Sequence, residues 1–232
     1  MPSVTTLPPI LLAHGFASSF ELNWRQPGFA DLLEEAGRTL IPFDFPGHGT
    51  GERSYDPERY ADLANDLASA LPPDDTLVDA VGFSMGAATL LRLATRVPER
   101  FRRLVVAGVG DNLFRESDRS TVADALEAGE ADDGNVAAQL FVQFSKAPGN
   151  DPKALATCMR RMEIPITAGE LARITCPVLV VLGDKDFAGP ADPLMDALPN
   201  ARLVLLRNTE HFATPRAFGF FDAALDFLAE PE

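Results

Sequence analysis

The chain has 232 residues, a formal net charge of −14 and 46% hydrophobic residues. This length suits one domain with a full hydrophobic core, and this composition excludes a disordered or fibrous protein. The negative charge argues against nucleic acid or an anionic membrane surface as a partner, because both favour clusters of Lys and Arg. The two cysteines, Cys158 and Cys176, form neither a metal-ligand spacing nor a disulfide framework.

The first apolar run, residues 9–13, is far too short to cross a bilayer, and no basic segment precedes it. We therefore predict a cytoplasmic protein with neither a signal peptide nor a membrane partner. The small number of cysteines fits a reducing compartment.

Short apolar runs alternate with segments of helical pattern along the chain. The runs that we expect to be strands are residues 10–13, 39–44, 79–81, 104–107, 178–182 and 202–206. We expect four helices beside these strands. The first starts near Pro27 and has Phe29, Leu32 and Leu33 on its inner side. The others cover residues 60–71, the stretch from the third strand to about Val97, and residues 215–228. This alternation predicts an α/β fold with a doubly wound, mainly parallel sheet of about six strands.

One segment, between residues 107 and 177, has no clear strand pattern. Its apolar spacing predicts helices over residues 118–128, 135–146, 152–162 and 168–173. We interpret residues 111–174 as a helical lid inserted into a core made of residues 1–110 and 175–232. The alternative is an extra helical layer, but the segment leaves the carboxyl edge of the sheet, where open α/β sheets bind ligands.

Residues 79–88, with the sequence DAVGFSMGAA, place Gly-x-Ser-x-Gly between a predicted strand and a predicted helix. A serine at such a sharp turn has a strained backbone, and side chains at Gly82 and Gly86 would clash with the neighbouring chain. The turn lifts the Ser84 hydroxyl clear of the sheet and directs a helix N-terminus toward the reacting centre. The pattern alone is a weak signal, and a tight turn with an ordinary serine is the alternative.

Five motifs occur in a fixed order along the chain: HGF (14–16), DFPGHG (44–49), GFSMG (82–86), GDKD (183–186) and EHF (210–212). In this order and these positions they resemble the motifs of the α/β-hydrolase-fold superfamily of serine hydrolases, over nearly the whole chain. The likeness is to small esterase- or thioesterase-like members with a helical lid.

The resemblance implies a catalytic triad of Ser84, His211 and Asp186. A serine hydroxyl needs a base, and His211 lies in the loop after the last predicted strand. Asp186 ends Gly-x-x-Asp after the preceding strand, so the order Ser, Asp, His matches this fold. Two alternatives for the acid are Asp184, which we interpret as a loop-shaping acceptor, and Asp111, the position used by a minority of the superfamily.

The oxyanion of an acyl-transfer intermediate needs hydrogen-bond donors. The resemblance assigns this role to the backbone N–H groups of Phe16, after the His-Gly pair, and Met85, directly after the nucleophile. The side chains at these two positions would instead shape the substrate pocket.

Further residues carry two interpretations each. His14 and His48 are expected to brace loops by hydrogen bonds rather than to act in catalysis. Phe16, Phe20 and Trp24 line an acyl pocket or belong to the core.

Two arginines of the predicted lid are also ambiguous. Arg160 and Arg161 are expected on a solvated face, and holding a substrate carboxylate is the alternative.

The chain departs from the family pattern in two places. Glu210 precedes the histidine where glycine is usual, and its carboxylate either raises the pKa of His211 or points to solvent. Only nine residues precede Ile10, so we expect the usual N-terminal hairpin to be missing or vestigial. We therefore predict six strands that are essentially all parallel.

The leading hypothesis is a serine hydrolase that cleaves a carboxylic ester or thioester of a small, largely uncharged molecule, with no metal or organic cofactor. Serine in the elbow argues against the dehalogenase and epoxide-hydrolase branches, which use aspartate. A lactonase, a C–C bond hydrolase, an aminopeptidase, a cofactor-free peroxidase and a menaquinone-pathway lyase would use the same triad. The acid-rich stretch 116–133 argues mildly against the lyase, which needs a basic pocket. A small-molecule-binding protein on the same scaffold is a rival of a different class.

Overall fold

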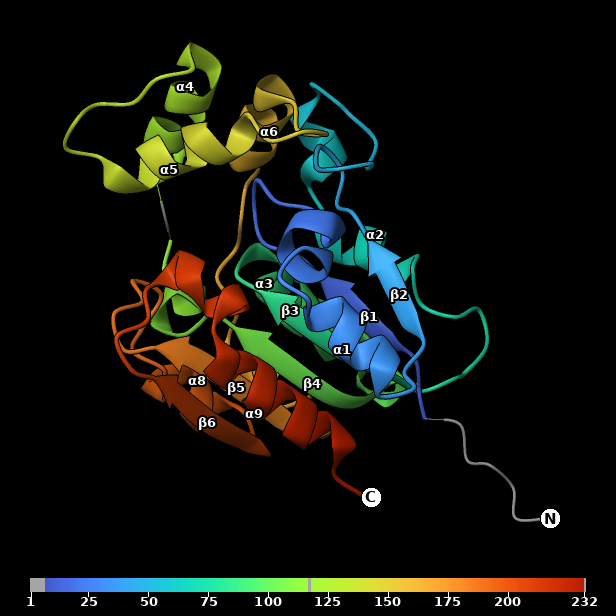
Figure 1. Cartoon of the computed structure of the whole chain (residues 1–232). Helices are drawn as coiled ribbons and strands as arrows, with labels where there is room; N and C mark the ends of the chain where they lie inside the picture. Colours follow the sequence, from blue (N-terminus) through green and yellow to red (C-terminus); the bar gives the residue numbers. More distant parts are fainter. Residues whose placement is uncertain (1–6, 117, 232) are drawn as a thin grey trace.

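A six-stranded sheet lies at the centre of the computed structural model, which describes residues 7–116 and 118–231 (Figure 1). The strands are β1 (Ile10–Ala13), β2 (Leu40–Phe43), β3 (Val78–Phe83), β4 (Phe101–Ala107), β5 (Val178–Gly183) and β6 (Ala201–Leu206). Their order across the sheet is β2-β1-β3-β4-β5-β6, and every neighbouring pair is parallel. The described residues thus confirm the prediction of a six-stranded parallel sheet.

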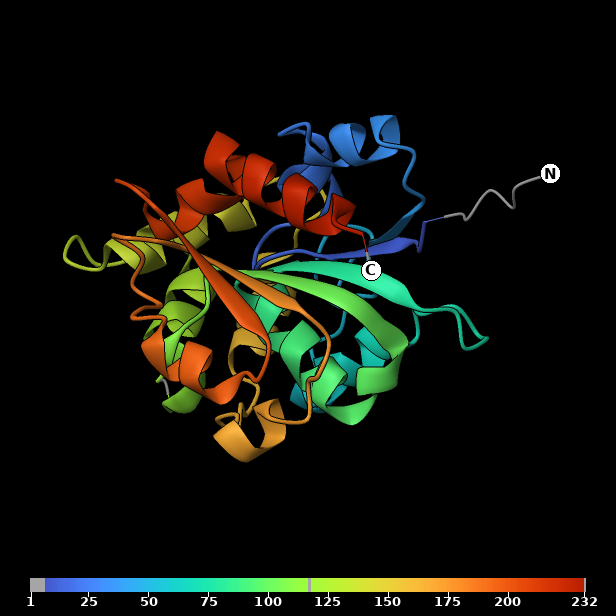
Figure 2. The same cartoon turned by 90° about the horizontal axis from the view of Figure 1, so that it is seen from below.

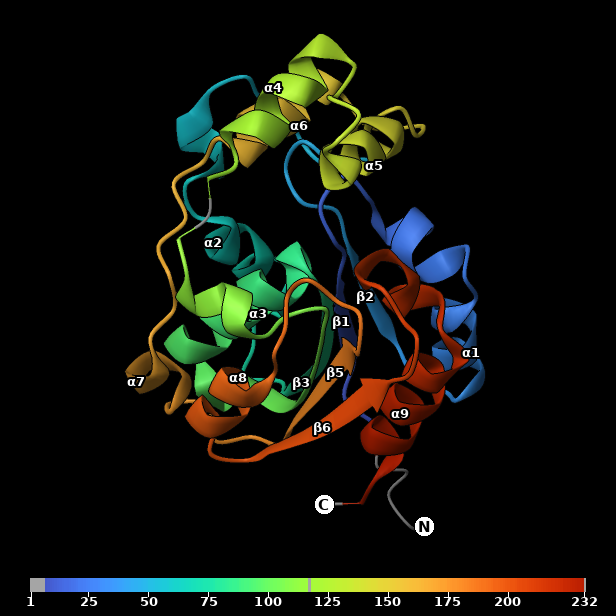
Figure 3. The same ribbon diagram turned by 90° about the vertical axis from the view of Figure 1, so that its left-hand side faces the viewer.

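Helices cover both faces of this sheet (Figures 2 and 3). One face carries α1 (Phe29–Glu35) and α9 (Phe218–Ala229). The other face carries α2 (Leu63–Ala68), α3 (Met85–Arg96), α7 (Ala168–Leu171) and α8 (Asp192–Ala197). Parallel strands between two helical layers are buried on both sides, which explains why they read as continuous apolar runs.

The two faces of β1 show how the core is divided. Ile10 and Leu12 pack into the cluster that contains Phe29 and Phe220 from α1 and α9. Leu11 and Ala13 point the other way, into the larger cluster formed with α2, α3 and α8. This alternation follows from the two-residue period of a strand.

A further group of helices lies beyond the sheet, at the top of Figure 1. It consists of α4 (Ser120–Ala128), α5 (Val136–Ser145) and α6 (Pro152–Met159). Phe141 of α5 contacts Phe16 and Phe212, which follow β1 and β6, so this group sits over the carboxyl ends of the strands. By contrast, α7 packs against α3 and α8 in the core. The insertion bounds 111–174 stay a prediction.

Short helical turns complete the described structure: η1 (Glu21–Arg25), η2 (Pro57–Tyr60), η3 (Pro98–Arg100), η4 (Asp111–Phe114) and η5 (His211–Arg216). The sequence patterns predicted neither η1 nor α8. Among the residues that the structure describes, no helix combines the length and the apolar character that crossing a bilayer requires.

Two details of the predicted helices are wrong. The helix expected over residues 60–71 is broken, because Asp62 leaves helical geometry (φ −136°) and caps α2 by accepting the N–H of Asn65 at 3.2 Å. Leu32 is exposed rather than inward, whereas Phe29 and Leu33 are buried, one helical turn apart.

Candidate active site

Ser84 joins β3 to α3 in a backbone conformation that non-glycine residues rarely adopt, with φ 52° and ψ −115°. Its N–H donates to the carbonyl of Ala107 on the neighbouring strand β4 at 2.8 Å. Its own carbonyl accepts the N–H of Ala88 at 2.9 Å, which starts the hydrogen-bonding of α3. The strained residue is therefore fixed by the sheet on one side and the helix on the other.

Glycine at position 86 allows the close contact that assembles the site. A Cβ atom there would lie 2.2 Å from the carbonyl oxygen of Ala13 and 2.5 Å from that of His14. No side chain fits at such distances, so α3 meets the end of β1 only because residue 86 has none. This contact brings the loop after β1, and with it Phe16, beside Ser84.

The three residues predicted as the triad form a chain of hydrogen bonds. The Ser84 hydroxyl lies 2.8 Å from Nε2 of His211, and Nδ1 of His211 lies 2.8 Å from Oδ1 of Asp186. Because a carboxylate accepts, Nδ1 is the donor in the second bond, which leaves Nε2 free to accept the serine proton. The Ala188 N–H also donates to Oδ1 of Asp186, at 2.9 Å. Both the aspartate and the histidine side chains are almost completely buried.

The two alternative acids lie elsewhere. Asp184 is exposed and accepts the N–H of Thr209 at 3.3 Å. Asp111 forms an ion pair with Arg115, four residues on, at 2.7 Å. Of the three candidates, Asp186 is the one that His211 contacts.

Aromatic rings enclose the imidazole of His211. The ring of Phe187 lies tilted against it with centroids 4.2 Å apart, and the ring of Phe83 lies at 5.0 Å. Phe212 meets it edge-on at 5.1 Å. No sequence pattern pointed to a role for Phe83 or Phe187, although each is adjacent to a residue of the predicted triad, Ser84 or Asp186. These contacts restrict the rotation of the imidazole and keep it aligned with its two partners.

The two backbone N–H groups predicted to receive the oxyanion belong to Phe16 and Met85. Met85 is the first residue of α3, and first-turn N–H groups have no acceptor within the helix. Within residues 7–116 and 118–231, neither the Met85 nor the Phe16 N–H has a hydrogen-bond acceptor. The structure brings both residues to the wall of the cavity that contains Ser84.

His14 and His48 are fully buried and hydrogen bond to loop backbone, as predicted. Nε2 of His14 accepts the N–H of Phe45 at 3.1 Å, and Nδ1 of His48 donates to the carbonyl of Pro46 at 2.9 Å. Burial lowers the pKa of His14 and holds the pKa of His48 well below its usual value, so both imidazoles are neutral.

A cavity of about 680 Å³ adjoins Ser84, in the size range of small-molecule sites. Its walls come from the core and from the upper helices. The lining includes Phe16, Met85, Ala88, Leu113, Val122, Phe141, Met159 and Phe187. Trp24 lies instead in the core against Phe29, so of the proposed acyl-pocket aromatics it is Phe16 that reaches the cavity.

The paired arginines of the upper layer have different surroundings. Arg160 is one-third exposed and binds Asp124 and Glu127 at 2.5 and 2.6 Å. The Arg161 side chain is only 8% exposed and lines the cavity, so the expectation of a solvated face is wrong for this residue. Packing between α6 and the core turns it inward, which residue order alone does not reveal.

Glu210 is exposed, and the His211 imidazole pairs with Asp186 rather than with this neighbour. The Glu210 carboxylate therefore points to solvent, which was one of the two expectations for this position. In the described parts of the chain, no cluster of three His, Cys, Asp or Glu side chains is placed to hold a metal ion.

The fold and the arrangement of Ser84, His211 and Asp186 are those of an α/β-hydrolase-fold enzyme. The model of the alpha/beta hydrolase family matches residues 10–228, and the chain therefore belongs to this family. It is an enzyme of the hydrolase class.

Three known proteins show the range of its relatives. The pimeloyl-(acyl-carrier protein) methyl ester esterase of Nitrosomonas europaea is 26% identical, over 88% of each chain. The 2-hydroxy-6-oxononadienedioate/2-hydroxy-6-oxononatrienedioate hydrolase of Escherichia coli K12 is 25% identical, over 87% of this chain and 80% of its own length. The crystal structure of bromoperoxidase from Bacillus anthracis superposes with a TM-score of 0.72 at 21% identity, over 97% of this chain and 93% of that one, which shows a common fold.

Proposed function

We propose that the protein cleaves a carboxylic ester or thioester of a small molecule through an acyl-enzyme on Ser84. The observation that carries this proposal is the continuous hydrogen-bonded chain from Ser84 through His211 to buried Asp186, on the wall of a cavity of small-molecule size. A curated relative named as a methyl ester esterase supports the ester as substrate class.

In the proposed mechanism, Oγ of Ser84 attacks the carbonyl carbon while Nε2 of His211 takes the serine proton. The oxygen of the tetrahedral intermediate receives hydrogen bonds from the Phe16 and Met85 N–H groups. Imidazolium then protonates the leaving alkoxide or thiolate, and Asp186 stabilises the positive charge in the meantime. Water, deprotonated by the same imidazole, releases the acid and restores Ser84.

The helices α4, α5 and α6 act as a lid in this proposal, within the insertion predicted over residues 111–174. Residues from these helices form part of the cavity wall above Ser84. A lid excludes bulk water from the reacting centre and shapes the pocket for its substrate.

A second reaction stays open on the same residues. The Escherichia coli relative is named as a hydrolase of a dienedioate, which makes cleavage of a C–C bond a second candidate reaction. A non-catalytic binding protein is the rival of a different class, and the intact triad geometry argues against it. The cytoplasmic location likewise stays a prediction.

The direct test is hydrolysis of p-nitrophenyl acetate by purified variants. Ser84→Ala should lower kcat by about 10⁴-fold or more. Asp186→Asn should cause a loss of about 10⁴-fold, because the imidazole tautomer is no longer fixed. Ser69→Ala, which removes an exposed hydroxyl at the C-terminal end of α2, is the matched control and should keep full activity. Turnover by a folded Ser84→Ala protein equal to that of wild type would refute the assignment.

A further inference from the structure

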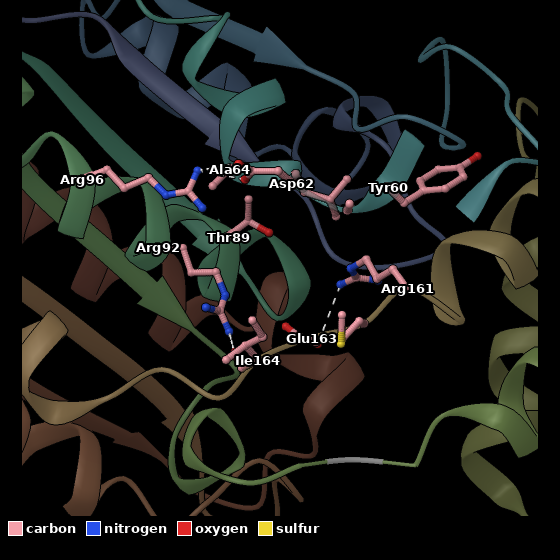
Figure 4. A pocket seen from close by; sticks show the side chains of 12 residues that line it. Tyr60, Asp62, Ala64, Thr89, Arg92, Arg96, Arg161, Glu163 and Ile164 are labelled. Atoms are coloured by element: carbon pink, nitrogen blue, oxygen red, sulfur yellow. Dashed lines mark hydrogen bonds and ion pairs between the residues drawn. The ribbon is translucent and has the colours of Figure 1, made fainter. Parts of the chain in front are cut away.

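A group of positive charges lies where the active-site cavity meets a second, smaller cleft. The cleft has a volume of about 130 Å³ and shares Arg92, Arg161, Glu163 and Ile164 with the cavity. Figure 4 shows Arg92 of α3 and Arg161, just after α6, reaching toward Glu163 and Ile164 from two sides. Residues 161, 163 and 164 thus lie between the cavity and the cleft.

Arg161 is the most deeply buried of these charges, with 8% of its side chain exposed. Its Nη1 donates to the carbonyl of Cys158 at 2.8 Å. Within the described residues, the only carboxylate near its guanidinium is that of Glu163, whose oxygen lies 3.9 Å from Nη2. That distance is beyond a hydrogen bond, so Nη2 faces the cavity wall without a close anionic partner.

Glu163 is committed elsewhere, because the same oxygen forms a close ion pair with Arg119 of the segment before α4. Arg92 donates to the carbonyl of Ile164 and has no carboxylate within ion-pairing distance among the described residues. Three guanidinium groups therefore share one carboxylate. Buried or half-buried charge of this kind is costly unless it is paired.

The neighbouring groups balance this excess only in part. Asp118 also lines the cavity, but it accepts the Ser120 N–H and forms no ion pair with an arginine among the described residues. Glu170 acts on Arg92 from beyond ion-pairing distance. His48 and Cys158 are neutral, since burial keeps the pKa of the imidazole well below its usual value and raises the pKa of the thiol. The other two arginines of the cavity wall are neutralised by their own partners, Arg115 by Asp111 and Arg160 by Asp124 and Glu127. In a chain of net charge −14, a local excess of positive charge beside the active site is notable.

The position of this cluster relative to the nucleophile follows from α3. Ser84, Ala88 and Arg92 are spaced four residues apart and all line the cavity, so they lie along one face of the helix. Eight residues of helix place Arg92 about 12 Å from Ser84. Small Ala88 leaves the space between them open.

We propose that the substrate hydrolysed at Ser84 carries an anionic oxygen group, a carboxylate or a phosphate, which binds Arg161 together with Arg92 and Arg119. The inference rests on the proposed ester hydrolysis and specifies its substrate class. It replaces the sequence-based expectation of a largely uncharged substrate. The anion supplies the missing partner of the cluster, while the helical spacing holds the ester carbonyl at the triad.

Matched pairs of esters test this inference on wild-type enzyme. On the acyl side, the pair is mono-4-nitrophenyl suberate and 4-nitrophenyl octanoate. On the alcohol side, hexyl acetate is compared with 6-acetoxyhexanoate and with 6-acetoxyhexyl phosphate, which separates carboxylate from phosphate. A charge-assisted hydrogen bond stabilises binding enough to raise kcat/KM about tenfold or more for the anionic member of at least one pair.

Arg161→Gln should remove most of this preference, mainly through a higher KM for the anionic ester, and Arg161→Lys should keep part of it. Arg96→Gln is the matched control: it lies one turn further along α3, pairs with Asp62 at 2.8 Å, and should leave the preference intact. Equal kcat/KM within every pair, or a preference that Arg161→Gln retains, would overturn the inference. Failure of wild type to hydrolyse any ester would instead refute the proposed function, so the two failures are distinguishable.

Discussion

Ser84 occupies a backbone conformation that the rest of the molecule must hold in place. Its φ of 52° is unfavourable for a residue with a Cβ atom, typically by 1–3 kcal/mol. The hydrogen bond to Ala107 and the close approach of Gly86 to Ala13 stabilise it. The hydroxyl therefore stands clear of the sheet, within reach of His211.

Gly86 is the residue at which this assembly is most sensitive to substitution. We expect Gly86→Ala to lower the free energy of unfolding by about 2 kcal/mol or more, because the new methyl group would overlap backbone atoms of Ala13 and His14. Activity should fall with it, since the overlap pushes the Phe16 loop away from Ser84. Urea unfolding and p-nitrophenyl acetate hydrolysis measure the two effects.

The matched control is Gly134→Ala, where a methyl group would meet no atom within 4 Å and the backbone has no positive φ. It should leave activity unchanged and stability nearly so. If Gly86→Ala behaved like this control, the account of the elbow would be incorrect.

Some residues of the site could be predicted from the sequence and others could not. The meeting of Ser84, Asp186 and His211 could be predicted, because the motifs that contain them occur in the order that a Ser-Asp-His triad has in this fold. The positions of the Phe187 and Arg161 side chains could not be predicted, because tertiary packing decides where an aromatic or a long charged side chain points. The inward turn of Arg161 depends on how α6 meets the core, which no local pattern encodes.

At the scale of elements, the loop between α5 and α6 is tied to the loop that follows β1. The Asn150 amide donates to the carbonyl of Ala17 at 2.9 Å and to that of Phe144 at 3.1 Å. Ala17 has a positive φ of 56°, directly after the proposed oxyanion donor Phe16. The Asn150 side chain thus links the proposed lid to the backbone next to the proposed oxyanion donor.

We expect Asn150→Ala to lower kcat/KM about tenfold, because the hydrogen bond to Ala17 that positions its loop is lost together with the bond to Phe144 that orients the asparagine. The α5–α6 segment should also become more sensitive to limited proteolysis, since it loses its anchor on the core. Steady-state kinetics and timed proteolysis with mass spectrometry measure both changes.

Asn200→Ala, in an exposed turn before β6, is the control and should change neither quantity. An Asn150→Ala protein with wild-type kinetics and proteolysis would show that this tie does not position the site.

The strands were predictable as elements because burial on both faces leaves an unbroken apolar run. The bounds of the helices were harder to predict. A stretch with leucines four residues apart predicted one helix over 60–71, but an aspartate side chain at position 62 captures a backbone N–H and starts a new helix there. The spacing of apolar residues does not reveal where a polar side chain forms a hydrogen bond with the backbone in this way.

At the scale of the whole molecule, two fully buried neutral histidines make the free energy of unfolding depend on pH. Burial lowers the pKa values of His14 and His48 below the value of 6.5 expected in the unfolded chain. As pH falls below about 6.5, the unfolded chain takes up protons that the folded chain does not. Stability is therefore complete above this pH and is lost toward acid.

We expect the free energy of unfolding to fall as the pH decreases below ~6, by at most about 1.4 kcal/mol per pH unit for each of these histidines. Urea unfolding at a series of pH values down to about 5, above the range where carboxylates titrate, measures the slope. His48→Gln, which cannot take up a proton, should make the slope shallower. An unchanged slope in that variant would show that His48 is not the group responsible.

The central claim is that Ser84 is an activated nucleophile, and labelling with a fluorophosphonate probe tests it most directly. The probe phosphonylates only a serine whose proton an adjacent base removes, and peptide mass spectrometry locates the modified residue. The structure predicts stoichiometric labelling at Ser84 in wild type and none in Ser84→Ala. Failure of the folded wild-type protein to react, or reaction at another serine, would contradict the claim and favour a binding protein on the hydrolase scaffold.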